Sequence, residues 1–473
     1  MSQWGSVSSL VKDVQTRKRT AKELVQQSLK TIKVNEDYKA IIATTEERAL
    51  KRADEIDRQI AQGEDAGRLA GVPFIAKDNF LAFGADTTAA SNILKGFDTP
   101  YQATAIERLE AEGAICVAKA NLDAFAHGSS TENSDFFATH NPHDKTRVPG
   151  GSSGGSAAAV VLDMAPFALG TDTGGSIRLP AAFCGAVGYK PTYGLVSRYG
   201  VIAMASSTDV IGPLTRSVED AALVLDVMAG KDEFDSTTIE RGKEGYTDLA
   251  GNLKGKKIGL IKEYFDGLDE DVKKVIDAAT IKLKKAGAEV VEVSMPSLPL
   301  ALAVYYIICP AEVSSNLSRY DGQRFGFSAK DVKDIDESYK KSRSQGFGSE
   351  AKRRIMIGAY VLSSGYYDAY YKRAQTVRTK LINEFKEAFS NVDFLLGPTA
   401  PSTAFKIGQN TDDPLKMYLT DIMTVAVNLV GVPAISVPAG EISGLPVGLQ
   451  LIAPQKKDRE LLEMADKTEE LLK

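Results

Sequence analysis

Two glycine- and serine-rich segments near the middle of the chain carry residues that could do nucleophilic chemistry. Residues 148–156 read VPGGSSGGS and residues 170–178 read GTDTGGSIR, within a stretch, 146–189, that has no lysine before Lys190 and no glutamate. Glycine lets the backbone approach a ligand closely, and successive backbone N–H groups can bind an anion. The pattern predicts either an anion-binding loop or a loop that presents a serine nucleophile.

Three familiar interpretations of these loops fit the sequence poorly. A phosphate-binding P-loop needs a lysine after its second glycine, and neither segment has one. The nucleophile elbow Gly-x-Ser-x-Gly is present at 150–154, but its triad needs a later histidine, and the last one is His143. A flexible surface linker is disfavoured by the apolar flanks 157–162 and 166–169.

The fourth interpretation is a serine activated by lysine. Lys77 follows the apolar run 72–76, where burial would lower its pKa and leave a neutral amine that can accept a proton. A chance lysine at a strand end is the alternative. A second Ser-x-x-Lys match, Ser338 to Lys341, lies among charged residues and indicates an exposed helix face.

Composition excludes several other classes of protein. The 473 residues include only three histidines and three cysteines, and the net charge is −5. The histidines, all within 127–143, lack the usual spacing of zinc ligands, so we expect no metal site. Three distant cysteines imply no disulfide framework and favour a reducing compartment. A mildly acidic chain lacks the charge of a stand-alone nucleic-acid binder.

Nothing near the N-terminus reads as a signal peptide, because residues 1–20 contain no apolar core segment. The longest apolar run, Leu298–Ala311, is too short to cross a membrane and contains two prolines. We therefore expect a cytoplasmic protein.

Predicted strands and helices alternate from end to end. This pattern indicates an α/β fold in which a large mixed sheet is covered by helices on both faces. We expect a single domain, 1–473, with a helical N-terminal segment, 1–65, and a cap-like helical stretch, 298–390. The expected strands are 72–76, 114–118, 166–169, 257–261, 289–293, 394–396, 434–437 and 447–451. The expected helices are 20–34, 44–63, 103–112, 157–164, one starting at 217, 270–286, 458–472, and two or three within 298–389.

Lys77-Asp78, GGSSGGS and DTGGSIRLPAAFCG (172–185) together resemble the amidase signature family. That resemblance implies a triad in which Ser176 is the nucleophile and neutral Lys77 is the base. Ser152 would relay the proton between them, and the Gly151–Ser152 peptide bond would be cis.

The resemblance also assigns the residues around the nucleophile. It implies an oxyanion hole formed by the backbone N–H groups of Thr173, Gly174, Gly175 and Ser176. Asp172, Arg178 and Ser153 would support the loop, although Asp172 and Arg178 could equally form a purely structural ion pair.

Further segments resemble one branch of that family, the A subunits of bacterial aspartyl/glutamyl-tRNA amidotransferases. They are 128–134 (GSSTENS), 316–326 (NLSRYDGQRFG), 350–358 (EAKRRIMIG) and 363–378 (SSGYYDAYYKRAQTVR). The resemblance implies a glutaminase without a cofactor of its own in a heterotrimer. A B subunit would use ATP and magnesium to activate misacylated tRNA and receive the ammonia, and a C subunit would clamp the two. The alternatives are a free-standing amidase acting on a small amide and a non-catalytic scaffold.

By the same resemblance, glutamine would be held at both ends of its amino-acid moiety. Arg354 would bind the α-carboxylate and Asp421 the α-ammonium group. Tyr305 or Tyr306 would lie nearby, with Gly128 and Ser129 also among the contacts. One departure stands out: His127 occupies a position before GSSTENS where an apolar residue, often methionine, is expected.

Overall fold

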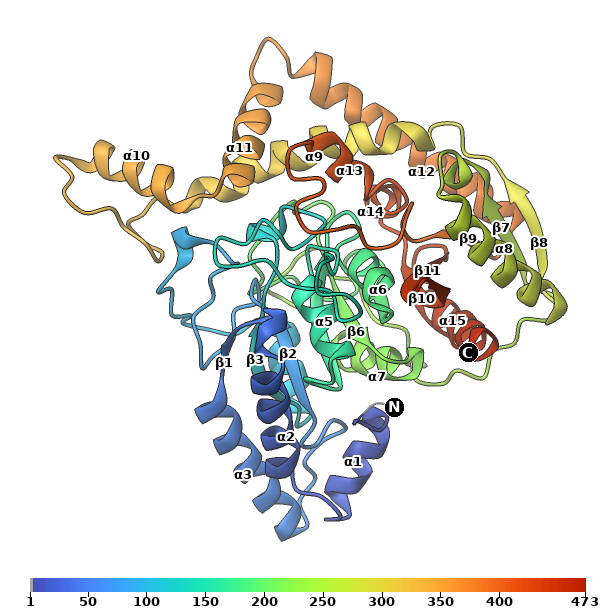
Figure 1. Ribbon diagram of the computed structural model, residues 1–473, viewed down its shortest axis with the longest axis horizontal. Helices are drawn as coiled ribbons and strands as arrows, with labels where there is room; N and C mark the ends of the chain where they lie inside the picture. Colours follow the sequence, from blue (N-terminus) through green and yellow to red (C-terminus); the bar gives the residue numbers. More distant parts are fainter. Residues whose placement is uncertain (1–2) are drawn as a thin grey trace.

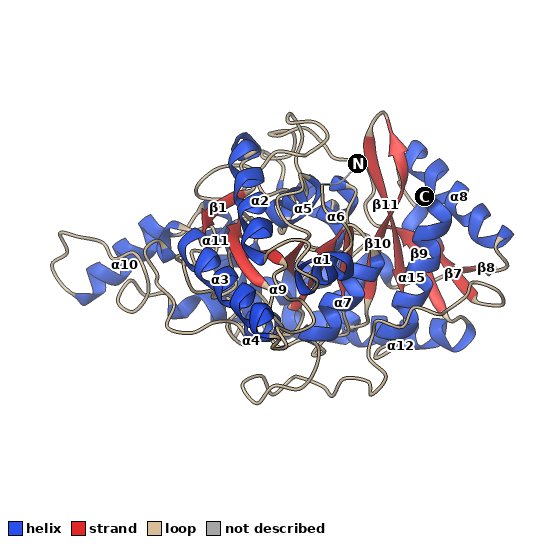
Figure 2. Cartoon of the chain, turned by 90° about the horizontal axis from the view of Figure 1, so that it is seen from below, coloured by secondary structure: helices blue, strands red, loops and turns tan. Residues whose placement is uncertain are grey.

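The computed structural model describes residues 3–473, and one mixed sheet of eleven strands runs through this part of the chain. Figure 2 shows the sheet extending from β1 at one end to β8 at the other, with helices on both sides. In spatial order the strands are β1 (Ile41–Thr44), β3 (Ile115–Ala120), β2 (Pro73–Lys77), β4 (Phe167–Asp172), β6 (Val210–Thr215), β5 (Val187–Lys190), β10 (Ala434–Ile442), β11 (Leu445–Ile452), β9 (Phe394–Pro398), β7 (Lys257–Ile261) and β8 (Glu289–Val293).

Parallel pairs occur in two places: β2 with β3 and β4, and β7 with β8 and β9. The other neighbours are antiparallel. Strands β2, β3 and β4 are buried along their whole length, as parallel strands covered on both faces must be. This accounts for the continuous apolar run that ends in Lys77.

The α-helices surround this sheet. They are α1 (Val7–Gln15), α2 (Ala21–Val34), α3 (Glu46–Gln62), α4 (Thr104–Ala111), α5 (Gly154–Val161), α6 (Arg178–Cys184), α7 (Val218–Met228), α8 (Glu270–Lys285), α9 (Ala301–Asn316), α10 (Ile335–Gly346), α11 (Ser349–Leu362), α12 (Arg373–Asn391), α13 (Pro414–Leu419), α14 (Val425–Val430) and α15 (Asp458–Leu472). In Figure 1, α9, α11 and α12 lie on one side of the molecule and α1, α2 and α3 on the opposite side.

Local signals placed most of these elements correctly. Thr20 and Glu23 form the expected capping box of α2, and Ser217 caps α7 by accepting the N–H of Asp220. The predicted βαβ unit is present as β7, α8 and β8, with parallel strands. The α/β fold with a mixed sheet is therefore confirmed.

Three strands were missed. Strand β1 falls in the segment expected to be helical, 1–65, where it is only four residues long. Strands β5 and β6 contain Gly188, Gly212 and Pro213, residues that weaken a strand pattern. The stretch 298–390 holds four α-helices, α9 to α12, rather than the expected two or three. The lower expected number arises because only Phe347 and Gly348 separate α10 from α11.

The helical segment that contains the apolar run 298–311 extends further along the chain than the run itself. Helical structure continues over Leu298–Arg319, 22 residues, which is long and apolar enough to cross a membrane, but half of its most apolar stretch is buried inside the protein. Helix α11 packs on α9 at Gly358, where a Cβ atom would lie 1.9 Å from the carbonyl oxygen of Pro310. The segment is therefore a core helix of this fold.

Candidate active site

Lys77 lies at the carboxyl end of β2 and is fully buried. Its Nζ lies 2.8 Å from Ser152 Oγ, 2.9 Å from Ser153 Oγ and 2.8 Å from Thr171 Oγ1. Burial lowers the pKa of Lys77 from 10.5 to about 7, although nearby carboxylates oppose that shift. A neutral amine has two N–H donors and one lone pair, so one of these three hydroxyl groups can donate to it.

Ser152 follows a cis peptide bond, Gly151–Ser152, as the resemblance implied. Ser153, the next residue, reaches Lys77 as well, and its backbone N–H donates to the carbonyl of Ser176 at 3.1 Å. The structure therefore brings the two predicted serine segments together through the backbone. Within residues 3–473 it has no hydrogen bond between the hydroxyl groups of Ser152 and Ser176.

Asp172 organises the loop that carries Ser176. Its carboxylate accepts the N–H of Gly175 at 2.8 Å and that of Ile177 at 3.2 Å, and it pairs with Arg178 at 3.0 Å. Burial alone would raise the pKa of Asp172, but the Arg178 guanidinium, the charge of Lys190 and the N–H of Ile177 together outweigh burial and hold that pKa at about 2. The pair is thus both an ion pair and a support for the loop.

Gly175 differs from the other predicted oxyanion donors, because its N–H group already donates to Asp172. It also has a φ of +137°, and a Cβ atom there would lie 2.2 Å from Thr424 Oγ1. Thr424 Oγ1 donates to the carbonyl of Gly174 at 2.6 Å, so the Gly174–Gly175 peptide unit is held at both its carbonyl and its N–H group. We therefore assign Gly175 a positioning part in the loop and leave Thr173, Gly174 and Ser176 as the open donors.

Arg178 is held by more than Asp172. Its guanidinium, fully buried, also donates to three groups around α14 and β11, the side chains of Asn428 and Gln450 and the carbonyl of Thr424. Charge-assisted hydrogen bonds of this kind are about twice as strong as neutral ones. The network ties the nucleophile loop to a part of the chain 250 residues away.

Arg354 projects from α11 and is almost completely buried, unlike its neighbour Arg353. Its Nε donates to Glu350 at 2.9 Å, and its guanidinium lies 5.3 Å from the ring centre of Tyr306 and 5.8 Å from that of Tyr418. The rings of Tyr306 and Tyr418 stack with centres 3.8 Å apart. Two aromatic faces thus fix the guanidinium, while only one of its nitrogens is taken up by Glu350.

Asp421 and Ser129 meet from distant parts of the chain: Ser129 Oγ donates to Asp421 Oδ2 at 2.6 Å. Burial raises the pKa of Asp421 to about 7, while the Ser129 hydrogen bond and the charge of Arg354 act in the opposite direction. Tyr305 connects this region to the nucleophile loop, because a Cβ atom on Gly174 would lie 2.7 Å from its ring. Thr424 Oγ1, which contacts the carbonyls of both Gly174 and Asp421, links the same loop to Asp421.

His127, the unexpected residue, is fully buried, and neither ring nitrogen has a hydrogen-bond partner among residues 3–473. Burial, with the positive charge of Arg354, lowers its pKa well below 6.5, so the imidazole is neutral. Its ring centre lies 6.1 Å from that of Phe125. His127 is therefore a buried, neutral histidine whose ring lacks a hydrogen-bond partner among the described residues.

The other two histidines bind backbone carbonyls. His140 Nδ1 contacts the carbonyl of Lys145 at 2.7 Å, and His143 Nε2 contacts that of Cys184 at 2.8 Å. Within the described residues there is no group of three histidine, cysteine or acidic side chains that could hold a metal ion. All three cysteines are free and buried.

Two residues that sequence reasoning did not single out lie at or near the lysine. Thr171 Oγ1 contacts Lys77 and also accepts the amide N–H of Asn79 at 3.1 Å. Thr171 belongs to the segment GTDTGGS, so its position beside the nucleophile loop was a usable signal; Asn79, two residues after Lys77, was another.

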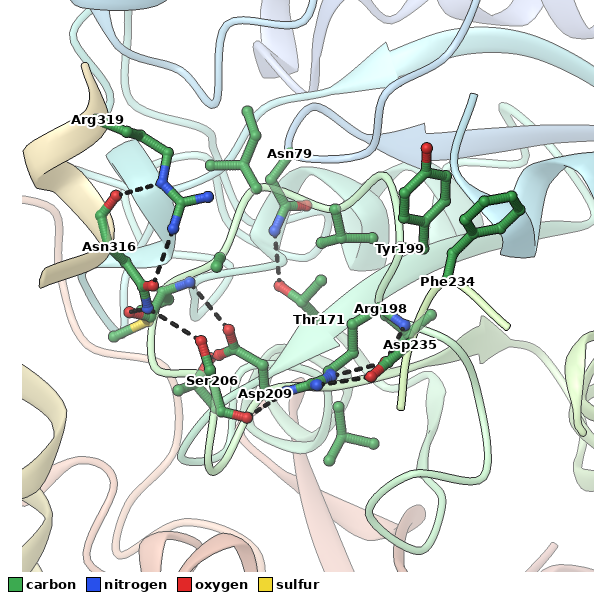
Figure 3. Close-up of a pocket in the computed structure, with 17 residues that line it drawn as sticks. Asn79, Thr171, Arg198, Tyr199, Ser206, Asp209, Phe234, Asp235, Asn316 and Arg319 are labelled. Atoms are coloured by element: carbon green, nitrogen blue, oxygen red, sulfur yellow. Dashed lines mark hydrogen bonds and ion pairs between the residues drawn. The ribbon is translucent and has the colours of Figure 1, made fainter. Parts of the chain in front are cut away.

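Asn79, Thr171 and Thr173 also line a cavity of about 220 Å³, shown in Figure 3. Its remaining walls come mainly from residues 198–211, together with Phe234, Asp235, Asn316 and Arg319. Arg198 in this wall forms a bidentate pair with Asp235. The cavity adjoins the residues that contact Lys77, and it contains none of the predicted glutamine contacts.

Known proteins resemble this chain over nearly its whole length. The model of the amidase family matches residues 23–462. The A subunit of a glutamyl-tRNA(Gln) amidotransferase from Caldanaerobacter subterraneus subsp. tengcongensis is 52% identical, with 97% of this chain and 95% of the relative covered. The same subunit from Geobacillus kaustophilus is 53% identical, with 94% and 93% covered.

Solved structures agree with this assignment. The crystal structure of the A subunit of glutamyl-tRNA(Gln) amidotransferase from Thermotoga maritima has a TM-score of 0.79 and 42% identity, covering 94% of this chain and 91% of that one. The peptide amidase of Stenotrophomonas maltophilia has a TM-score of 0.84 and 30% identity, covering 99% and 97%. Together with the site geometry, these matches place the chain in the amidase signature family.

Proposed function

We propose that this chain is the glutamine-hydrolysing subunit of a tRNA-dependent amidotransferase. The observation that carries the proposal is the contact of buried Lys77 with Ser152, in a protein that also holds a buried arginine, Arg354, and a buried carboxyl group, Asp421. This arrangement offers a serine relay for amide cleavage and opposite charges for an α-amino acid. The identity of 52% to an A subunit over 97% of the chain supports the same assignment.

Acylation begins with Ser176. Its Oγ attacks the carboxamide carbon of glutamine while its proton passes to Ser152 Oγ, and the proton of Ser152 passes to the neutral amine of Lys77. The carbonyl oxygen becomes an oxyanion, stabilised by the backbone N–H groups of Thr173, Gly174 and Ser176. Removing one such donor typically costs about 10²–10³ in rate.

Collapse of the tetrahedral intermediate breaks the C–N bond. The relay returns the proton from Lys77 through Ser152 to the leaving nitrogen, which departs as ammonia and leaves a γ-glutamyl ester on Ser176. Water then attacks this ester, its proton following the same path, and glutamate and free Ser176 are formed. The net reaction consumes glutamine and water and yields glutamate and ammonia.

Substrate selection rests on charge. Arg354 keeps further N–H donors for a carboxylate, because Glu350 engages only its Nε and Cys309 Sγ accepts from one terminal nitrogen at 3.8 Å. Asp421 binds the ammonium group in its ionised form, and Ser129 orients its carboxylate. Tyr305 lies against Gly174 of the nucleophile loop, and Tyr306 packs against the Arg354 guanidinium. Gly128, next to Ser129, lies against the side chain of Asp123.

The wider assembly follows from the same assignment. A B subunit would bind ATP, magnesium and misacylated tRNA and receive the ammonia, and a C subunit would complete a cytoplasmic heterotrimer. This chain would hold no cofactor of its own. One amidase domain, 1–473, would carry the activity, because one continuous sheet joins β1 to β8.

The test is to purify the chain alone and together with the products of neighbouring genes. We expect ammonia release from glutamine, a stable complex, and transfer of the ammonia to misacylated tRNA. Ser176→Ala should lower glutamine hydrolysis by about 10⁴-fold or more. An active monomer that cleaves simple amides, ignores glutamine and forms no complex would instead identify a free-standing amidase.

A further inference from the structure

Asp123 is a buried carboxyl group beside the serine–lysine relay, and the mechanism above gives it no part. Its side chain is fully buried. Oδ2 accepts the N–H of Thr131 at 2.9 Å, and Oδ1 accepts that of Asn133 at 3.1 Å. Because a buried carboxylate is costly unless it is hydrogen-bonded, these two backbone groups favour its ionised form.

The carboxyl group packs directly on the two loops of the site. A Cβ atom on Gly151 would lie 2.2 Å from Asp123 Oδ2, and one on Gly128 would lie 2.4 Å from its Cγ. Gly151 precedes Ser152, and Gly128 precedes Ser129. Asp123 therefore touches the backbone next to the relay serine and next to the serine that orients Asp421.

Thr131 extends this contact to both sides of Ser152. Its N–H is bound to Asp123, while its Oγ1 donates to the carbonyl of Gly150 at 2.8 Å and accepts the N–H of Gly154 at 3.1 Å. Gly150 and Gly154 flank the relay serine, one on each side. The position of Ser152 thus depends on a threonine that Asp123 holds.

Electrostatics gives Asp123 a second link to Lys77. Burial lowers the pKa of Lys77, and three carboxylates, Asp123, Asp172 and Asp209, raise it, with Asp123 the strongest of them. Asp172 is already paired with Arg178. Asp209 accepts hydrogen bonds from Thr173 and from two backbone N–H groups, at Met204 and Ala205.

Asp123 and Lys77 titrate close together. Burial raises the pKa of Asp123 to about 6, with Glu132 raising it further and Lys77 opposing, while the pKa of Lys77 is about 7. The charge on each group therefore shifts the pKa of the other.

We propose that Asp123 is a positioning residue of the relay: its negative charge governs when Lys77 becomes neutral, and through Thr131 it fixes the loop that carries Ser152. This inference depends on the proposed function in one respect only, namely that glutamine is the substrate. The effect of Asp123 on the charge of Lys77 can be tested separately from its effect on the loop, because a substitution at Thr131 changes the loop contact without changing any charge.

The experiment measures two rates against pH: glutamine hydrolysis, and labelling of Ser176 by a fluorophosphonate, which needs no glutamine. In Asp123→Asn we expect the acid limb of both profiles to move to lower pH by about 0.5–1 unit, because Lys77 loses the charge that stabilises its protonated form. Asp123→Ser removes the same charge and leaves room for water at the two N–H groups. This variant replaces Asp123→Asn in the experiment if Asp123→Asn folds poorly.

Two further variants separate charge from geometry. Thr131→Val should lower both rates and leave the acid limb in place. Asp220→Asn is the matched control: Asp220 is also a buried carboxyl group that accepts a backbone N–H, from Val7 at 2.8 Å, but it has no contact with the relay, so both profiles should remain unchanged.

Unmoved acid limbs in folded Asp123→Asn and Asp123→Ser would overturn the inference. A limb that moves equally in Thr131→Val would also overturn it, since geometry alone would then set the pH response. Fluorophosphonate labelling without glutamine hydrolysis in the wild type would refute the proposed function instead, and the labelling profiles would still decide the part of Asp123.

Discussion

Ser129 Oγ donates a hydrogen bond of 2.6 Å to Asp421 Oδ2, joining residues 292 positions apart in the chain. The bond fixes the carboxyl group proposed to bind the ammonium end of glutamine, because it ties the loop of Ser129, which lies next to Asp123, to the segment that precedes α14. Asp421 is nevertheless buried deeply enough that its pKa is raised to about 7. The charge on this carboxyl group therefore changes within the range of pH in which the relay itself titrates.

The KM for glutamine should rise as the pH falls below about 7. Asp421 has a raised pKa, so its carboxylate exists mainly above that value, and only the ionised form attracts an ammonium group. Steady-state kinetics between about pH 5.5 and about pH 8.5, a range that spans both charge states, measures this. In Asp421→Asn the KM should be high and independent of pH. A wild-type KM that stays constant across the range would contradict the assignment.

The kcat should fall in acid for a separate reason. Burial lowers the pKa of Lys77 to about 7, so the amine is neutral above that pH and protonated below it, and only the neutral form accepts the serine proton. We expect kcat to fall about tenfold per pH unit well below 7. Circular dichroism over the same range controls for unfolding. A flat kcat profile would remove Lys77 as the base.

Arg354→Ala should raise the KM for glutamine by about 100-fold, the cost of losing a charge-assisted contact worth about 3 kcal/mol. Arg353→Ala is the matched control: the adjacent side chain is 45% exposed, against 2% for Arg354, and its loss should change the KM little. An uncharged primary amide tests for general damage, since its hydrolysis should be similar in both variants. Equal effects of the two substitutions on glutamine would exclude the carboxylate role.

His127→Met should increase the free energy of unfolding by about 1–2 kcal/mol, because it removes two buried nitrogens that lack partners. The gain should grow as the pH falls below 6.5, since the unfolded wild-type chain then binds a proton that the buried imidazole does not. Urea unfolding at about pH 6 and about pH 8 measures both effects. A variant less stable than the wild type at both values would show that the imidazole has a favourable contact.

The contact between Lys77 and Ser152 is present as the family resemblance implied, because both residues lie in short motifs that the sequence shows directly. The role of Ser176 as the nucleophile stays a prediction, since the described residues show no hydrogen bond between its hydroxyl group and that of Ser152. Thr171 was missed although its place in the segment GTDTGGS was a usable signal, because its contact with Lys77 depends on the pairing of β2 with β4. Asp123 was missed for a similar reason: its influence depends on Gly151 and Gly128, which only the fold brings against its carboxyl group.

The fold shows the same division between local and distant causes. Helix α2 was predictable because Thr20 and Glu23 cap it within one turn. Strand β7 is largely apolar, and the three valines of β8 favour a strand although its two glutamates are exposed. Strands β5 and β6 owe their pairing to partners elsewhere in the sheet, and their glycine and proline residues conceal it. The engagement of the Gly175 N–H by Asp172 likewise depends on how the loop folds back, which no local pattern reveals.

The buried cysteines have a practical consequence. Burial raises the pKa of the Cys116 and Cys309 thiols to about 12 and raises that of Cys184 still further, so none forms the thiolate that reacts with maleimides at neutral pH. A cysteine introduced at Phe234, whose side chain is 71% exposed, would then be a unique attachment point for a fluorophore, without prior removal of native thiols. Because Phe234 borders the cavity beside Thr171 and Thr173, the dye would report directly on occupancy near the relay.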